Sequence, residues 1–139
     1  MLDARTGQSV WKFDVPRGFD IDATSAAHGD RIFFSIFREV NSTPSGARLF
    51  AIDDQSGKVI REHRPGGGLT GPSVCRDQVY FGSTADVFFS AVDAKGKGDG
   101  TTELLWRYKL GGVIEESCPA VYGRMAFVLC SNRYLYAFE

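Results

Sequence analysis

The feature of this sequence that most constrains its fold is a pattern that repeats along the chain. An apolar residue is followed by an aspartate, a turn and a second apolar run, and this order begins at Leu2, Ile52 and Val92. A further copy ends the sequence over Leu135–Glu139. The copies are spaced by roughly 40–50 residues, a period typical of folds that stack one small supersecondary unit per repeat. The chain is therefore expected to be a repeat structure.

Each repeat divides into short strands. Alternating apolar and polar residues, separated by turn residues, predict antiparallel sheets. The run Arg31–Phe37 is apolar on both faces, which suits a central strand covered on each side. No segment repeats its apolar residues with a helical period, so almost no helix is expected. We expect strands over residues 24–28, 31–37, 48–53 and 58–64, then 70–75, 78–84, 87–93 and 104–108, and finally 118–121, 124–130 and 133–139.

Four strands in a repeat of this length is the arrangement of a β-propeller blade. The sequence thus predicts an all-β fold, a β-propeller of four-stranded antiparallel blades, with about three blades' worth in the chain. Within a single domain over residues 1–139, we expect an outer strand over 9–15, blades over 22–65 and 69–109, and three strands of a further blade over 112–139. A propeller usually needs roughly 4–8 blades to close its ring. The chain is therefore expected to be part of a larger propeller, or one half of a six-bladed head-to-tail dimer.

The turn in each repeat has a structural explanation. An aspartate at a strand end caps the turn with its side-chain oxygen, and a glycine that follows adopts positive φ before the outer strand starts. A tryptophan after the turn is expected to lie flat between blades, where it buries a large area. Arg61 replaces this tryptophan in one repeat, so the contact there must be made differently. The residues with this structural role are Asp3, Asp53, Asp93, Gly7, Gly57, Trp11 and Trp106.

Composition argues against several classes of function. The chain carries 16 Lys and Arg against 17 Asp and Glu, which lacks the basic excess typical of nucleic-acid binding. No apolar run reaches the roughly 18 residues needed to span a membrane, and the first residues do not form a signal peptide. The three cysteines lack the spacing of a zinc site, and neither histidine lies beside a nucleophile in the sequence.

Two groups of residues are candidate sites. Four acidic residues are expected at one mouth of the channel, where their carboxylates could hold a hard cation such as Ca²⁺. Solvated loop charges are the favoured interpretation, so no metal site is assigned and these residues stand only as candidates: Asp20, Asp22, Glu115 and Glu116. The long hairpin loop over 38–46 is the candidate partner-binding loop, with a tolerated insertion as the alternative. Its candidate contact residues are Glu39, Asn41 and Pro44.

The segment Leu2–Phe13, with its Asp-Ala-x-Thr-Gly turn followed by a tryptophan, resembles the PQQ-like β-propeller repeat of quinoproteins. Pro72–Val74 with Gln78–Ser83, and Pro119–Val121 with residues 124–139, are similar to the other half of that repeat. The resemblance implies a dehydrogenase that binds pyrroloquinoline quinone, an outer-membrane assembly lipoprotein, or a quinoprotein-like domain fused to another enzyme. The chain departs from the quinone enzymes because it has no adjacent cysteine pair and only two tryptophans, both in the outer-strand position.

We therefore expect a non-catalytic scaffold that mediates protein–protein interaction, with no catalytic residue and no cofactor. The alternatives are a fragment of a quinone-dependent dehydrogenase, whose cofactor would be PQQ with Ca²⁺, and an accessory sensor domain of a multidomain enzyme. The expected partners are another protein, further repeats of the same polypeptide or a second copy of the chain. No nucleic-acid partner and no membrane-spanning segment are expected. The compartment would be periplasmic for an assembly lipoprotein or dehydrogenase parent, and cytoplasmic otherwise.

Overall fold

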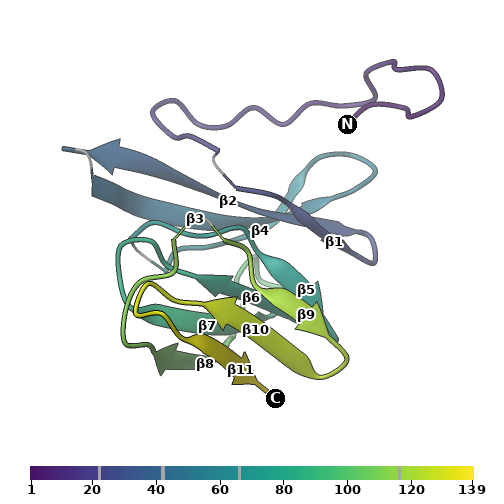
Figure 1. The fold of residues 1–139 in the computed structure, drawn as a ribbon. Helices are drawn as coiled ribbons and strands as arrows, with labels where there is room; N and C mark the ends of the chain where they lie inside the picture. The colour runs from purple at the N-terminus through teal and green to yellow at the C-terminus, as the bar shows by residue number, and fades with distance from the viewer. Residues whose placement is uncertain (22, 42, 66, 116) are drawn as a thin grey trace.

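The structure is a computed structural model, and it describes residues 1–21, 23–41, 43–65, 67–115 and 117–139, with the backbone alone of Pro44. Within these ranges the chain is all-β, with eleven strands in three antiparallel sheets and no helix (Figure 1). The described residues accordingly contain no helix that is long and apolar enough to cross a membrane. The predicted all-β fold of short antiparallel blades is confirmed.

The three sheets follow one another along the chain, and the strands of each sheet pair in chain order. The first sheet comprises β1 (Ala26–His28), β2 (Arg31–Val40), β3 (Thr43–Asp53) and β4 (Val59–His63). The second sheet comprises β5 (Ser73–Cys75), β6 (Gln78–Gly82), β7 (Phe88–Asp93) and β8 (Leu104–Lys109). The third sheet has three strands, β9 (Ala120–Tyr122), β10 (Met125–Leu129) and β11 (Leu135–Phe138).

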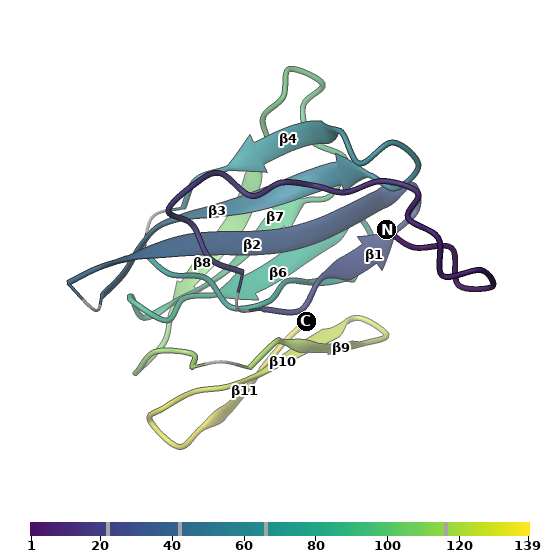
Figure 2. The same ribbon diagram turned by 90° about the horizontal axis from the view of Figure 1, so that it is seen from above.

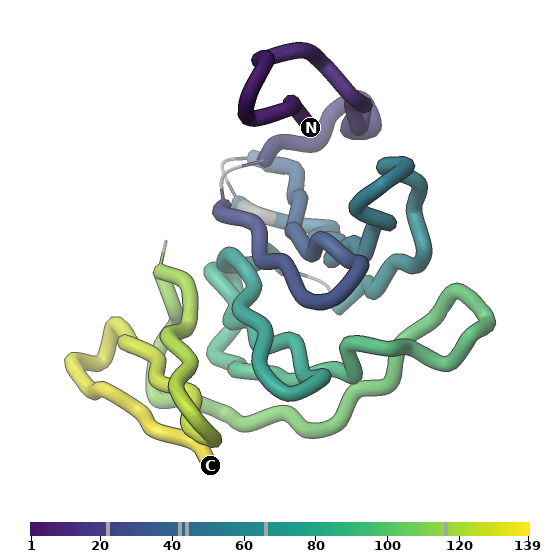
Figure 3. Tube along the Cα trace, turned by 90° about the vertical axis from the view of Figure 1, so that its right-hand side faces the viewer, coloured from purple at the N-terminus to yellow at the C-terminus, as the bar shows by residue number. Residues whose placement is uncertain are grey.

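The sheets are held together by three apolar cores that lie between successive layers of the chain (Figure 3). Strand β2 contributes to two of them, because side chains alternate across a strand. Phe33 is 1% exposed and packs in the core between the first and second sheets, whereas Phe34 and Ile36 pack on the opposite face. The expectation of a central strand covered on both sides is therefore correct. A separate core around Phe89 joins the second sheet to the third.

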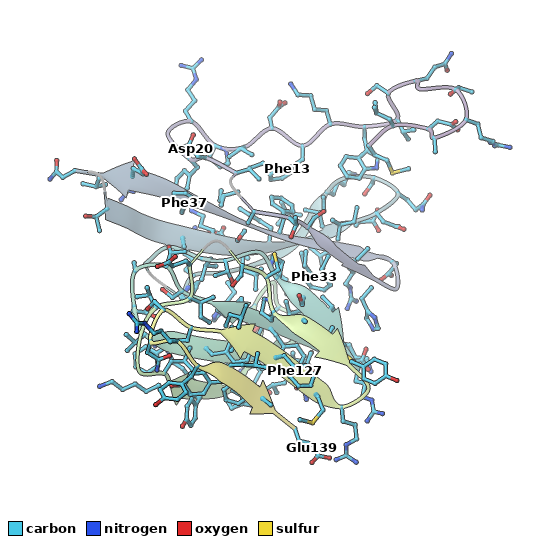
Figure 4. All side chains as sticks on the ribbon, in the orientation of Figure 1. Phe13, Asp20, Phe33, Phe37, Phe127 and Glu139 are labelled. Carbon is cyan, nitrogen blue, oxygen red and sulfur yellow. The ribbon has the colours of Figure 1, made fainter. Side chains whose placement is uncertain are left out.

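The N-terminal segment differs from the prediction, because residues 10–16 form no strand. Only Ser9 pairs with another residue there, through an isolated bridge to Leu2. The segment instead crosses the outer face of the first sheet, over β2 and β3 (Figures 1 and 2). Its alternate side chains, Trp11, Phe13 and Val15, pack on the apolar face that Phe34, Ile36, Phe50 and Ile52 form. Figure 4 shows Phe13 directed from the segment towards that sheet. The segment has the predicted alternation, but a strand also requires a hydrogen-bonding neighbour along its length, and the described backbone contacts here end with those of Val10 and Trp11 to Met1.

The predicted hairpin loop over 38–46 is also different, because most of it is paired strand. After an irregularity between Ile36 and Arg38, the pairs Arg38–Ser45, Glu39–Pro44 and Val40–Thr43 continue the ladder of β2 and β3. Asn41, in the turn, has a φ of 52°, a left-handed conformation that asparagine tolerates better than most residues. We refer to residues 38–45 as the β2–β3 arm. It is a two-stranded extension of the first sheet and not an irregular loop.

Candidate functional site

The repeated turns share one set of hydrogen bonds. The Asp3 carboxylate accepts from the backbone N–H groups of Arg5 and Thr6 at 2.9 and 2.8 Å. The Asp53 carboxylate accepts from Ser56, through its N–H at 2.7 Å and its hydroxyl at 2.6 Å. The Asp93 carboxylate accepts from the N–H groups of the two residues that begin the enlarged third turn, each at 2.7 Å. Each aspartate therefore satisfies backbone donors that the turn would otherwise leave unpaired.

These hydrogen bonds favour the ionised form of the aspartates. The bonds from Thr6 and Arg5 lower the pKa of Asp3, and the bonds from Ser56 lower the pKa of Asp53. Gly7 and Gly57 follow these aspartates with φ values of 70° and 67°, which L residues rarely adopt. The side-chain hydrogen bonds of each aspartate thus stay within its own turn.

Trp11 anchors the N-terminal segment to the turn of the first sheet. Its indole N–H donates to the backbone oxygen of Asp54 at 2.9 Å. The ring lies directly over Gly57, where an added Cβ would come within 2.6 Å of the Trp11 ring atom Cε3. Gly57 therefore serves two purposes, because it provides the positive φ and also leaves room for the indole.

Trp106 lies between the second and third sheets in a cluster of aromatic rings. Its ring stacks on Phe138 of β11 with a centroid distance of 5.6 Å and an interplanar angle of 21°. It also meets Phe89 edge-on at 5.6 Å and Tyr80 at 6.0 Å. This arrangement joins two sheets through apolar area alone, as aromatic pairs of this geometry commonly do.

Arg61 occupies the tryptophan position of the first sheet, and its side chain is 5% exposed. Its guanidinium donates through Nη2 to the backbone oxygens of Asp93, at 3.3 Å, and of Ala94. The guanidinium also lies 5.6 Å from the centre of the Phe33 ring. Burial lowers the pKa of Arg61, although an arginine remains charged at any ordinary pH. The substitution of Arg for Trp in the repeat was visible in the sequence, but the carbonyl groups that it would bind were not.

A polar cluster adds to the same contact between the first and second sheets. Asp77 accepts from Lys95 at 2.8 Å and lies 3.2 Å from the Nε2 atom of His28. These two partners, Lys95 first, lower the pKa of Asp77. The cluster is partly exposed, so it adds only modestly to the stability of the contact between the two sheets.

The acidic residues proposed for the channel mouth do not form a described metal site. Asp20 and Glu115 are both exposed, and the backbone of Asp20 pairs with that of Phe37. Asp22 and Glu116 lie outside the described residues. Among the residues that the structure does describe, no three His, Cys, Asp or Glu side chains come together as metal ligands would.

The described residues do not gather into a site for the quinone cofactor that the resemblance implies. Both tryptophans are engaged with a neighbouring layer, Trp11 on Gly57 and Trp106 on Phe138. The three cysteines are separate free thiols, at positions 75, 118 and 130. The described part of the chain therefore offers neither a tryptophan floor nor a calcium ligand set for such a cofactor.

The partner-loop candidates lie on the β2–β3 arm. Glu39 and Asn41 are exposed, and the backbone of Pro44 pairs with Glu39. Strand β1 pairs with β2 only over Arg31–Phe33, and β4 pairs with β3 only over Leu49–Ile52. The arm thus extends past the neighbouring strands (Figure 1), with both of its outer edges beyond them.

At the base of the arm is a hollow of about 250 Å³ that the sequence did not reveal. We call it the arginine pocket. Its walls are formed by Phe19, Arg38, Gly46, Ala47, Arg48 and Arg64. These residues come from the N-terminal connection, β2, β3 and the residue that follows β4, so only the folded chain brings them together. The one signal in the sequence is that β2, β3 and the residue after β4 each carry an arginine of the pocket, namely Arg38, Arg48 and Arg64.

The family model described as "Outer membrane protein assembly factor BamB" matches residues 1–139. The crystal structure of BamB from Moraxella catarrhalis superposes with a TM-score of 0.57 and 15% sequence identity, over 98% of this chain and 49% of that one. A computationally designed protein, Ika4, superposes with a TM-score of 0.46 and 12% identity, over 96% of this chain and 98% of that one. A search of curated protein sequences finds no match.

The chain spans about half the length of the BamB chain that it matches. The matched structure is a propeller, and the three sheets described above correspond to part of such a ring. Because the family model covers every residue from the first to the last, the protein belongs to the BamB family of PQQ-like β-propellers.

Proposed function

We propose that this chain is the protein-binding part of a larger propeller scaffold and that it carries out no chemistry itself. The family description, an outer membrane assembly factor, supports a role in holding other proteins together. The observation that carries the proposal is the β2–β3 arm. It extends past β1 and β4, so its edges present backbone N–H and C=O groups that another strand could pair with.

Exposed apolar side chains support the same surface. Val40, on the arm, is 47% exposed, and Ile21, in the connection that leads to the first sheet, is 54% exposed. An exposed apolar side chain on the arm, as at Val40, would add apolar contact area for a strand that pairs with the arm. A fold alone does not determine a function, so the proposal depends on this surface and not on the propeller architecture.

Photo-crosslinking tests the proposal. A photoreactive amino acid placed at position 40 in the full-length protein, in cells that make it, is expected to give one discrete crosslinked protein. Leu104, on β8, is equally exposed at 47% and serves as the matched control position. Crosslinks to the same proteins from both positions, or none from position 40, would show that the arm is not the surface that binds the partner.

We propose further repeats of the same polypeptide, in preference to a second copy of the chain, as the cover for the free edge of β11. The match to half of a longer BamB chain supports this choice. Light scattering of the purified chain distinguishes the two, because a head-to-tail dimer would have twice the 15.3 kDa mass of the chain. A stable dimer that closes into a ring would overturn this part of the proposal.

The rival function is a piece of a quinone-dependent dehydrogenase. Titration of the chain with PQQ in the presence of Ca²⁺ is expected to show no saturable change in quinone absorbance. Stoichiometric binding would replace the scaffold with a cofactor-binding role.

A further inference from the structure

The arginine pocket lies at the polar end of a sheet face that is otherwise apolar. In the ladder, Ile36 pairs with Arg48 and Phe50 pairs with Glu62. Residues at alternate positions share a face, so the charged side chains continue the face on which Phe34 and Phe50 pack. The N-terminal segment covers the apolar part of this face, and Phe19 covers part of its charged end.

Two contacts hold Arg48 in place. Its guanidinium lies 4.3 Å from the centre of the Phe19 ring, and its Nε is 3.4 Å from a carboxylate oxygen of Glu62. The Arg48 side chain is only 25% exposed. A guanidinium held against an aromatic ring loses little further freedom when it binds a ligand, so Arg48 is preorganised.

The pocket carries more positive charge than its own acid balances. Arg64 also pairs with Glu62, at 2.7 Å, so one carboxylate serves two guanidinium groups. Arg38 is the third arginine that lines the pocket, and its guanidinium lies 5.9 Å from the centre of the Phe19 ring. Three arginines thus line the pocket, and one described carboxylate pairs with two of them, in a chain whose formal charge is −1. The local excess is positive although the whole chain is not.

Another cluster in the chain shows what a balanced arrangement looks like. Arg107 of β8 lies 3.8 Å from the centre of the Phe88 ring and pairs with Asp86 at 3.0 Å. This cluster has one arginine, one aromatic ring and one carboxylate, so it is complete by itself. The arginine pocket combines the same kinds of group, but it has three arginines and one described carboxylate, so two positive charges are not balanced within it.

From these contacts we propose that the arginine pocket binds a carboxylate of an acidic, extended segment on a protein partner. This proposal rests on the scaffold function and names the chemistry of the partner. Guanidinium groups bind carboxylates through paired N–H donors, and the Phe19 ring provides apolar contact for the neighbouring atoms. A hollow of about 250 Å³ has room for one or two side chains. The pocket adjoins the exposed edge of the arm, which suits an extended peptide better than a membrane surface, since that would need a broad basic face.

Fluorescence polarisation with a defined probe tests the proposal. The probe is a labelled, end-blocked peptide of alternating Glu and Val, and its control is the same peptide with Gln in place of Glu. We expect the Glu peptide to bind and the Gln peptide not to bind. Arg38→Gln or Arg64→Gln is expected to weaken binding roughly fivefold, the upper value for an exposed ion pair. Arg107→Gln is the matched control and is expected to leave binding unchanged.

The Arg64 side chain is 68% exposed, so Arg64→Gln is expected to fold normally, which thermal unfolding checks. Equal binding of the two peptides, or equal binding by the wild type and both pocket variants, would overturn the proposal. Displacement of the Glu peptide by inorganic phosphate, or by vesicles that contain phosphatidylglycerol, at concentrations where glutamate has no effect would also overturn it, in favour of a phosphate site.

The photo-crosslinking experiment separates this proposal from the scaffold function. If position 40 still crosslinks one protein in Arg38→Gln and the Glu peptide fails to bind, the scaffold stands and the carboxylate site is wrong. If the peptide binds but position 40 gives no crosslink, the carboxylate site stands and the arm is not where the partner sits.

Discussion

The first and second sheets each contribute one side chain to the next layer from the same ladder position, but the two side chains differ in kind. Arg61 pairs with Ala51 in the first sheet, and Trp106 pairs with Ala91 in the second. Arg61 reaches backbone oxygens of the second sheet, whereas Trp106 meets Phe89 of the second sheet edge-on and stacks on Phe138 of the third. The repeat therefore fixes where a contact is made, and the residue at that position decides which force makes it.

The difference has an energetic consequence. An aromatic contact gains from area and tolerates small displacements, because dispersion and the hydrophobic effect are not directional. A buried guanidinium depends on acceptors at the correct places, and Arg61 has one buried nitrogen, Nη1, without a partner among the described residues. The interface with Arg61 is thus more specific in register, and the interface with Trp106 is stronger per residue.

The largest expected effect is the loss of Trp106. Trp106→Ala removes a ring that packs against both Phe89 and Phe138, and we expect the free energy of unfolding to fall by about 3 kcal/mol. Urea unfolding followed by circular dichroism measures the loss. Leu104→Ala, at a 47% exposed position of the same strand, is the control and is expected to cost less than about 1 kcal/mol. Similar losses for the two variants would show that the ring is not what joins the sheets.

Arg61 provides the second prediction. Arg61→Ala removes charged donors from two backbone oxygens and leaves a void, so we expect a loss of about 2 kcal/mol. Arg61→Met fills the same space without burying a charge, and we expect it to cost less than about 1 kcal/mol. Chemical unfolding of both variants decides the matter, and a methionine variant as unstable as the alanine variant would mean that the hydrogen bonds outweigh the packing.

A pair of glycines separates backbone strain from packing. Gly7→Ala and Gly57→Ala both place an L residue at positive φ, which costs about 1 kcal/mol. Only at Gly57 does the new Cβ also meet the Trp11 ring, so Gly57→Ala is expected to cost about twice as much. Tryptophan fluorescence in a Trp106→Phe background should change for Gly57→Ala alone. Identical emission and stability in the two variants would contradict the placement of Trp11.

The smallest expected effect concerns pH. His63 lies beside Phe81 at the interface with Arg61, and burial lowers its pKa below the ordinary value of 6.5. The unfolded chain therefore binds a proton more readily than the folded chain, so stability is fully present above pH 6.5 and declines as the pH falls below it. Urea midpoints at pH 7.5 and 5.5 should differ less in His63→Gln than in the wild type. An equal shift in both proteins would assign the pH dependence to other groups.

Local interactions explain why the strands could be predicted. The turns depend on hydrogen bonds between residues two or three apart, such as those that the N–H groups of Arg5 and Thr6 donate to Asp3, and the strands follow a period of two. Both signals lie within a short window of sequence. For this reason the predicted ranges match strands such as β7 and β8 to within about one residue at each end.

The parts that could not be predicted depend on distant partners. Residues 9–15 have the alternation of a strand, but strand formation depends on a neighbour along the whole segment, and the described chain pairs only its first residues, with Met1 and Leu2. The arginine pocket combines Phe19, Arg38 and Arg64, which are far apart in the sequence, and Arg38 lies just after the register shift in the β2–β3 ladder. A register shift of this kind has no local signature in the sequence.

The anchoring contacts all point in one direction along the chain. The Trp11 indole donates to a carbonyl 43 residues later, and the Arg61 guanidinium donates to one 33 residues later. During translation, each anchor is therefore synthesised before its acceptor. Neither hydrogen bond can form until the acceptor that follows it in the chain has also been synthesised, so a chain that is cut short before the acceptor keeps the anchor but loses the contact.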